Sequence, residues 1–346
     1  MRIAQIAPPW IPVPPVTYGG TELMVNLLVR GLRDRGVEVS LFCSGDSTIP
    51  VSKYGPYPKS FWPPDKFSEN LQISFAWSHL RAHPPQVIHS HLENAAGFWA
   101  AAPLPAPLII TLHTPLTPVK QDYLKSFPQV SLVTVSDFQR RQLHGHPQLH
   151  LIPHGLDVND YPFQAEKEDY LVFLGRIYAD KGLHTAIQLA QETGRRLLIA
   201  GPVFPPDKPY FDQAIYPHLD KERIIYRGPA DFQQKVELLS RAQALILPLE
   251  VDEAFGLVLL ESMACGTPVL AYDRGAVREV VVSGQTGFVV PDFSTLREAL
   301  TLVPRIKPSN CREHVEKHFS LDQMVESYLH LYRRLILKEL PVTSCQ

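Results

Sequence analysis

Two glutamates, Glu253 and Glu261, are separated by seven residues in the run Glu-Ala-Phe-Gly-Leu-Val-Leu-Leu-Glu. Gly256 indicates the start of a helix, so Glu261 is expected on that helix and Glu253 in the loop before it. The amides of Phe255, Gly256 and Leu257 then form the positive end of a helix dipole, where a phosphate or sugar oxygen can bind. Carboxylates accept hydrogen bonds from paired hydroxyls, which suits sugars and riboses. By spacing alone, two solvated glutamates flanking a buried helix remain an alternative.

Two cations, Arg176 and Lys181, follow an apolar run that is predicted to be a strand, in the sequence Gly175-Arg176-Ile-Tyr-Ala-Asp-Lys181-Gly. We expect one in the loop and one at a helix start. Fixed cations at such a place can stabilise a diphosphate as its charge grows. Taken alone, they could also be ordinary surface charges.

A glycine pair, Gly19-Gly20, follows the first predicted strand and precedes a helix. Glycine permits close backbone approach, and a helix N-terminus favours anions. The spacing is not that of a dinucleotide-binding G-x-G-x-x-G loop, so an NAD site is disfavoured. A simple tight turn is the alternative.

Histidines are frequent in the first half, and His89 and His91 share one face of a predicted strand while His113 ends the next. Zinc would need three or four ligands around one point, and no Cys, Asp or Glu completes a recognisable set. No two aspartates stand two positions apart, so the sequence lacks a D-x-D pair of metal-binding carboxylates. We therefore expect no metal and no cofactor.

Short apolar runs alternate with helix-length amphipathic stretches along nearly the whole chain. Runs such as Leu-Ile-Ile-Thr-Leu are apolar throughout, as strands covered on both faces require. The fold class is therefore α/β, with doubly wound parallel sheets in two Rossmann-like domains facing a deep cleft. The boundaries are expected at 1–153 for the N-terminal domain and 154–320 for the C-terminal domain, and the last helix is expected over 321–340.

Composition is globular, with 346 residues, 45% hydrophobic and 20% charged, and no apolar run long enough to span a membrane. A net charge of −2 does not favour a nucleic-acid partner, and the excess of positive charge in the first half is slight. Four scattered cysteines, Cys43, Cys265, Cys311 and Cys345, are expected as reduced thiols in a cytoplasmic protein.

The chain resembles the retaining GT-B glycosyltransferases of family 4. The pattern E-x-F-G-L-x-x-x-E-x-M-x-x-G-x-P-V is present in full from Glu253. Gly-Gly-Thr-Glu at 19–22, Val-Ser-Asp-Phe-Gln-Arg-Arg at 135–141 and Ile-Pro-His-Gly-Leu-Asp at 152–157 are also similar, with His154 in place of the usual Asn. The resemblance covers essentially the whole chain.

This resemblance implies that the domain 1–153 binds the acceptor and the domain 154–320 the nucleotide-sugar donor. It also implies a role for each site residue. Glu253 would contact the donor sugar's hydroxyls, Glu261 the nucleotide ribose, and Arg176 and Lys181 the departing diphosphate. His113 would orient the donor, with His89 and His91 behind it. The donor-binding set would also include the glycines and backbone amides Gly19, Gly20, Gly175, Gly201, Phe255, Gly256 and Leu257.

The resemblance further implies a nucleotide-sugar donor, with a UDP-hexose such as UDP-glucose favoured over GDP-mannose, and a C-terminal helix that crosses back to the first domain. Front-face attack, with a donor phosphate oxygen taking the acceptor's proton, would explain why no protein base is evident. The acceptor could be a small molecule, a sugar or a lipid, with weak peripheral contact of the N-terminal domain with the inner membrane face. A nucleotide-sugar epimerase or hydrolase on the same fold remains open, as does an inactive binding protein.

Overall fold

The computed structural model describes residues 1–339 apart from Pro64 and Lys66. These residues form two compact units. The first comprises Met1–Pro15, Gly19–His154 and the chain from Leu321 onward, and the second comprises Val16–Tyr18 and Gly155–Ser320. The expected division differs by one residue at the linker and in the assignment of residues 16–18, and residue 340 of the expected last helix lies outside the described residues.

The first unit is built on a seven-stranded parallel sheet with the strand order β3-β2-β1-β4-β5-β6-β7. Its strands are β1 (Arg2–Ile6), β2 (Glu38–Phe42), β3 (Ser52–Tyr54), β4 (Val87–Ser90), β5 (Leu108–Leu112), β6 (Ser131–Thr134) and β7 (Leu149–Leu151). Its helices are α1 (Gly20–Asp34), α2 (Ser68–Ala82), α3 (Ala95–Ala101), α4 (Pro118–Lys125), α5 (Asp137–Gln142) and α13 (Leu321–Glu339).

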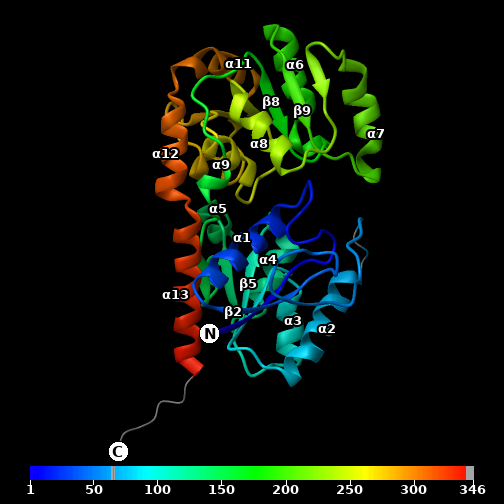
Figure 1. The fold of residues 1–346 in the computed structure, drawn as a ribbon, viewed down its shortest axis with the longest axis vertical. Coiled ribbons are helices and arrows are strands. Elements are labelled where there is room, and N and C mark those ends of the chain that lie inside the picture. The colour runs from blue at the N-terminus through cyan, green and yellow to red at the C-terminus, as the bar shows by residue number, and fades with distance from the viewer. Residues whose placement is uncertain (64, 66, 340–346) are drawn as a thin grey trace, which may run out of the picture. The chain divides into compact units, whose positions relative to one another are not determined.

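The two faces of this sheet are packed differently. On one face, α2, α3 and α4 contribute residues such as Trp77 and Leu124 to an apolar core with Ile88 and Ile110 of the sheet. On the opposite face lie α1 and α13, which run side by side (Figure 1). Every residue of β4, β5 and β6 is buried, because both faces are covered.

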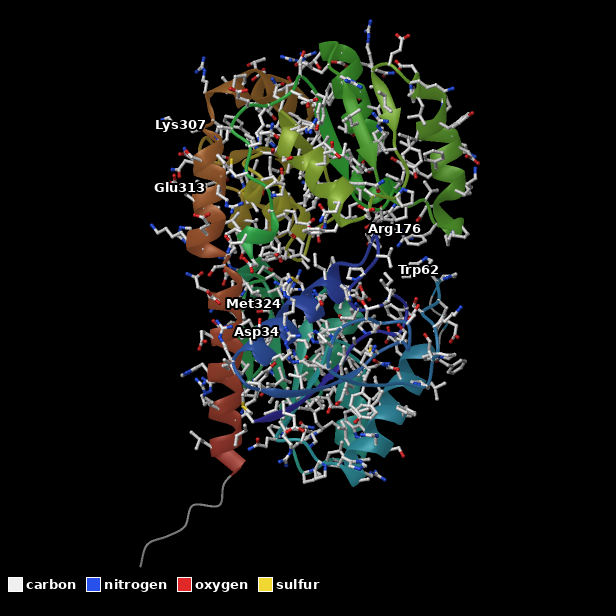
Figure 2. The ribbon with its side chains drawn as sticks, in the orientation of Figure 1. Asp34, Trp62, Arg176, Lys307, Glu313 and Met324 are labelled. Carbon is white, nitrogen blue, oxygen red and sulfur yellow. The ribbon has the colours of Figure 1, made fainter. Side chains whose placement is uncertain are left out.

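Contact between α13 and α1 is close. A Cβ atom on Gly31 of α1 would lie 2.4 Å from Cγ2 of Val325, so only glycine permits this approach without a shift. At the end of α1, Arg35 donates hydrogen bonds to Asp322 and Glu326 of α13, both over 2.6 Å. Figure 2 labels Met324 on α13 beside Asp34 at the end of α1.

The second unit is built on a six-stranded parallel sheet with the order β10-β9-β8-β11-β12-β13. Its strands are β8 (Leu171–Leu174), β9 (Leu197–Ala200), β10 (Ile224–Tyr226), β11 (Ala244–Leu247), β12 (Val269–Tyr272) and β13 (Gly287–Val290). Its helices are α6 (Leu183–Thr193), α7 (Lys208–Tyr210), α8 (Phe232–Arg241), α9 (Leu257–Ala264), α10 (Val277–Val280), α11 (Phe293–Leu302) and α12 (Pro308–His318).

The predicted fold class is confirmed, since both sheets are parallel and each strand is followed by a helical or loop crossover. The sequence did not predict β3, β7 or α4. The two strands are three-residue edge strands that are partly exposed, so they lack the buried apolar run that marks an inner strand. Pro118 opens α4 and Thr117 caps it, and these two residues are the local signal in the sequence for the start of this helix.

Cys43, Cys265 and Cys311 are buried free thiols, whereas Cys345 lies outside the described residues. Within the part of the chain that the structure describes, no helix combines the length and apolar character that a membrane crossing would need.

Candidate functional site

In the second unit, Lys181 and Glu253 are brought together from two loops at the carboxyl edge of the sheet. Lys181 follows β8 and Glu253 follows β11, and Lys181 Nζ donates to Glu253 Oε2 over 2.5 Å. Gly182 makes this possible, because it has a φ of 70° and a Cβ there would lie 1.9 Å from the carbonyl oxygen of Pro248. Gly275 packs closely against Glu253 in the second loop, because a Cβ atom added at Gly275 would clash with the backbone of Glu253. Both residues were predicted from the sequence as site residues, but an ion pair between them was not predicted.

Arg176 lies in the loop after β8 (Figure 2) and is held by Asp207. Its Nε donates to Asp207 Oδ2 over 2.7 Å and an Nη donates to Oδ1 over 3.1 Å. The guanidinium also lies over the rings of Tyr178 and Phe204, at 4.8 Å and 5.3 Å from their centroids. These contacts fix the plane of the guanidinium. Sequence reasoning missed Asp207, which is 31 residues away along the chain and follows the next strand, β9.

Helix α9 starts as predicted after Gly256, which adopts a left-handed conformation with a φ of 87°. Glu261 lies on this helix and is only 4% exposed. Its carboxylate pairs with the ammonium of Lys235 from α8 and accepts a hydrogen bond of 3.2 Å from the Tyr161 hydroxyl. Burial, followed by the neighbouring Glu261 charge, raises the pKa of Tyr161 well above its ordinary value, so Tyr161 remains a donor.

Lys235 and Tyr161 were not singled out from the sequence, because neither lies in a motif and both reach Glu261 only through the fold. The glycine positions are explained by close backbone contact. A Cβ on Gly201, after β9, would lie 1.7 Å from the carbonyl oxygen of Gly175, after β8. The two loops therefore touch at glycines at the same edge as Arg176.

In the first unit, the glycine pair opens α1. Gly19 is its N-cap, with a φ of 150°, and Gly20 is the first helical residue. Glu22 follows in the first turn and is 3% exposed, and burial raises the pKa of its carboxyl to about 8. A Cβ on Gly19 would lie 2.8 Å from Oε2 of Glu22, so the bare glycine leaves room for this carboxyl group.

The predicted histidines form one cluster in the first unit. His91 Nδ1 and His113 Nε2 are 2.8 Å apart, and the His113 ring stacks on His154 with centroids 5.2 Å apart. His89 lies beside His91, with ring centroids 4.4 Å apart. Burial lowers the pKa of both His89 and His113 to about 3, so these rings are neutral at neutral pH.

The ring nitrogens of this cluster are used in hydrogen bonds. His89 bonds to the hydroxyls of Tyr332 and Thr111, and His91 bonds to Gln5 and His113. Among the residues that the structure describes, no group of three or more His, Cys, Asp or Glu side chains is arranged to hold a metal ion. Gln5, Thr111 and Tyr332 were not predicted, and only the buried position of Gln5 in an apolar strand could have drawn attention to it.

Both halves of the chain match glycosyltransferase families. Residues 160–305 match the family Glycosyl transferases group 1, and residues 18–160 match Glycosyltransferase Family 4. The alpha-maltose-1-phosphate synthase of Mycobacterium tuberculosis is 29% identical over 84% of each chain, and the phosphatidyl-myo-inositol mannosyltransferase of Mycobacterium leprae is 26% identical over 88% of each. The crystal structure of Anabaena HepE in complex with UDP-glucose superposes with a TM-score of 0.78, at 18% identity, over 97% of this chain and all of that one. The chain therefore has the GT-B fold, and its matching families and relatives indicate a glycosyltransferase.

Proposed function

We propose that the protein is a retaining glycosyltransferase that transfers a hexose from a nucleoside diphosphate sugar to an acceptor hydroxyl. The observation that carries this proposal is the Lys181–Glu253 ion pair in the same unit as the buried Glu261, which is held by Lys235. Carboxylates that can bind sugar hydroxyls and cations that can bind a diphosphate thus lie at one edge of a parallel sheet. Folds of this kind bind their ligands at that edge.

In this proposal each residue has one task. Glu253 binds hydroxyls of the donor sugar, and Glu261 binds the two ribose hydroxyls, with Lys235 and Tyr161 fixing its orientation. Arg176 and Lys181 stabilise the negative charge that grows on the diphosphate as the glycosidic bond breaks. The glycines at 175 and 201 and the amides from Phe255 to Leu257 allow the phosphates to approach the backbone.

The first unit carries the other binding residues of this proposal. Gly19 and Gly20 present the N-terminus of α1, and His113 orients the donor sugar through a hydrogen bond. The two cations of the second unit supply the positive charge that other glycosyltransferases take from a metal ion on a D-x-D pair, so we propose turnover without a divalent metal.

A UDP-hexose is the favoured donor. Its support is the similarity in fold to HepE, whose crystal structure was obtained with UDP-glucose. GDP-mannose is the second candidate, because one relative is a mannosyltransferase. The acceptor is a small molecule, a sugar or a lipid.

A thermal-shift screen of UDP and GDP sugars tests the donor, because a bound ligand stabilises the protein by RT ln(1 + [L]/Kd). We expect a rise in melting temperature with UDP-glucose that is larger than with GDP-mannose. Proton NMR of the product then reports whether the anomeric configuration is kept. Turnover of the donor with no acceptor present would instead favour an epimerase or a hydrolase, and a product of inverted configuration would refute retention.

A further inference from the structure

Seven side chains in the first unit form one continuous hydrogen-bonded chain. It runs from His113 through His91 to Gln5 over two contacts of 2.8 Å, and from Gln5 to Tyr332 over 3.1 Å. From Tyr332 it continues to His89 over 2.7 Å, to Thr111 over 2.7 Å and to Tyr328 over 2.9 Å. We name it the histidine chain. It joins the ends of β1, β4 and β5 to the two buried tyrosines of α13.

The amide of Gln5 gives the histidine chain a direction. An amide oxygen only accepts and an amide nitrogen only donates. Because Gln5 Oε1 faces His91 Nε2, that nitrogen carries the proton, and in a neutral ring Nδ1 of His91 is then bare. Nε2 of His113 must therefore donate to it, which leaves Nδ1 of His113 as an unprotonated acceptor.

The contacts on the other side of Gln5 follow from the same orientation of its amide. Gln5 Nε2 donates to the Tyr332 hydroxyl, so the single proton of Tyr332 is available for His89 Nδ1. His89 then donates from Nε2 to Thr111, and Thr111 donates to Tyr328. Each of the five inner members accepts once and donates once, whereas His113 only donates at one end and Tyr328 only accepts at the other. One reversed tautomer near Gln5 would require all of the linked members to reverse.

A second proton on His89 or His91 would break the histidine chain, because both nitrogens of each ring are already engaged and two protons would meet in one contact. The inner members of the histidine chain are buried, with Gln5, His89 and Tyr332 at 0% exposure, and burial lowers the pKa of His89 and His113 to about 3. The rings therefore stay neutral at physiological pH, which is the condition for a single tautomer.

His113 lies at the accessible end of the histidine chain. It follows β5 at the carboxyl edge of the sheet and is partly exposed, unlike His89 and His91. In the described part of the protein, Nε2 of His113 contacts His91, whereas Nδ1 has no protein partner. An acceptor atom with no proton thus stands at the edge where parallel sheets bind ligands.

We propose that the histidine chain fixes the tautomer of His113, so that Nδ1 accepts a hydrogen bond from a sugar hydroxyl, and that Gln5 and Tyr332 are positioning residues for the reaction. The substrate role rests on the proposed function, whereas the tautomer does not. A consequence is selectivity for a hydroxyl group at the contacted carbon, because an ether, a carbonyl or a fluorine there has no proton to donate.

The tautomer is measured on the ligand-free protein. Long-range proton–nitrogen correlation spectra of ¹⁵N-histidine-labelled protein, with His113 assigned by its loss in His113→Gln, distinguish a bare from a protonated Nδ1. We expect a bare Nδ1 and a protonated Nε2 at neutral pH. A protonated Nδ1 would overturn the inference whether or not the protein is a glycosyltransferase, and the tautomer itself is measured on the unchanged protein.

The positioning role is tested with two matched variants on the same face of α13. Tyr332→Phe removes the hydroxyl next to Gln5, so the tautomers of His91 and His113 are no longer held to one direction. Tyr328→Phe removes a hydroxyl that is equally buried but only accepts at the far end. We expect a mixture of His113 tautomers in Tyr332→Phe and not in Tyr328→Phe. We also expect kcat/KM to fall about tenfold in Tyr332→Phe only, which corresponds to the free energy of one lost hydrogen bond. Equal effects of both variants on the spectrum and the rate would mean a merely structural role.

Donor analogues then link the tautomer to the substrate. UDP-glucose is compared with its deoxyfluoro analogues, in which one sugar hydroxyl at a time is replaced by fluorine. At one position of the sugar, replacing the hydroxyl by fluorine should lower kcat/KM about tenfold more in the wild-type protein than in Tyr332→Phe. If no position distinguishes the two proteins while the His113 tautomer is as expected, the substrate role is wrong. If UDP-glucose neither binds nor turns over, the proposed donor fails, and the tautomer result stands separately.

Discussion

Lys181 Nζ and Glu253 Oε2 lie 2.5 Å apart and tie the loop after β8 to the loop after β11. Burial by itself lowers the pKa of the Lys181 ammonium, but the Glu253 carboxylate more than offsets it, so the pKa is raised. Lys181 thus stays charged at neutral pH although little of its side chain reaches solvent. A cation held in this way is available to a diphosphate without a change of protonation.

Alanine variants of the two cations test whether they act on the leaving group. If Arg176 and Lys181 stabilise charge that develops only in the transition state, Arg176→Ala and Lys181→Ala should each lower kcat by about 10²–10³. Arg176→Lys should recover part of the loss, because an ammonium cannot reproduce the guanidinium fork that Asp207 holds. Steady-state kinetics decide this. A raised KM with an unchanged kcat would mean that the residues only hold the donor.

The two glutamates should fail in different ways. Glu261→Gln should weaken binding of free UDP by about 1.5–3 kcal/mol, since it removes a charged hydrogen-bond acceptor from the ribose. Glu253→Gln should lower kcat and leave UDP affinity nearly unchanged, because UDP carries no sugar for it to contact. Calorimetry with UDP on both variants measures the difference, and Glu237→Gln on the exposed side of α8 is a matched control. Identical losses of affinity would refute the assigned roles.

Chelation tests the metal-free proposal. Activity should survive an excess of EDTA, because Arg176 and Lys181 supply the positive charge at the diphosphate. The measurement is the initial rate before and after EDTA, followed by the addition of Mn²⁺ or Mg²⁺. A rate that falls on chelation and returns with either metal would contradict the proposal.

Glu22 should make stability depend on pH. Its pKa is raised to about 8 by burial, from an ordinary value of 4.5. Between these pH values the native state holds a proton that the unfolded chain has released, so the free energy of unfolding falls as pH rises, by at most about 1.4 kcal/mol per pH unit. Glu22→Gln removes this penalty. Urea denaturation should show an advantage of the variant that grows between about pH 5 and pH 8; an advantage independent of pH would argue against the buried carboxyl.

The contact between α1 and α13 can be tested by one methyl group. In Gly31→Ala the new Cβ would lie 2.4 Å from Val325 Cγ2, and such overpacking should cost about 1–3 kcal/mol of unfolding free energy. Val325→Ala should cost less in the Gly31→Ala background than alone, because it frees the space that the methyl group needs. Denaturation of the four proteins measures the coupling. Additive effects would mean that the two helices do not touch at these residues.

The features that could be predicted from the sequence are those that depend on residues close together along the chain. The inner strands appear as buried apolar runs, and the start of α9 follows from Gly256 next to Glu253. The sequence did not predict pairings between distant residues. Arg176 and its partner Asp207 lie in loops after two different strands. Glu261 and its partner Lys235 lie on two different helices. In both pairs, the residues next to one partner do not indicate the other.

The histidines show the same limit. The sequence placed His89 and His91 on one face of a strand and His113 at the end of the next. It gave no reason to connect them with Tyr332, which is 243 residues beyond His89. In the sequence of α13 this tyrosine stands among apolar residues, and a tyrosine in such a stripe contributes to packing as well as to hydrogen bonding, so the stripe alone indicates no polar role.

The first unit is assembled from two separate stretches of chain, whereas the second is nearly continuous. During synthesis the ribosome releases residues 1–154 long before α13, so β1, β4 and β5 emerge with Gln5, His89 and Thr111 still lacking the tyrosine hydroxyls that later satisfy them. The second unit can complete its sheet in that interval, since domains fold as units while the chain grows. The half that is translated first is therefore the half that finishes folding last, and α13 is the step that closes it.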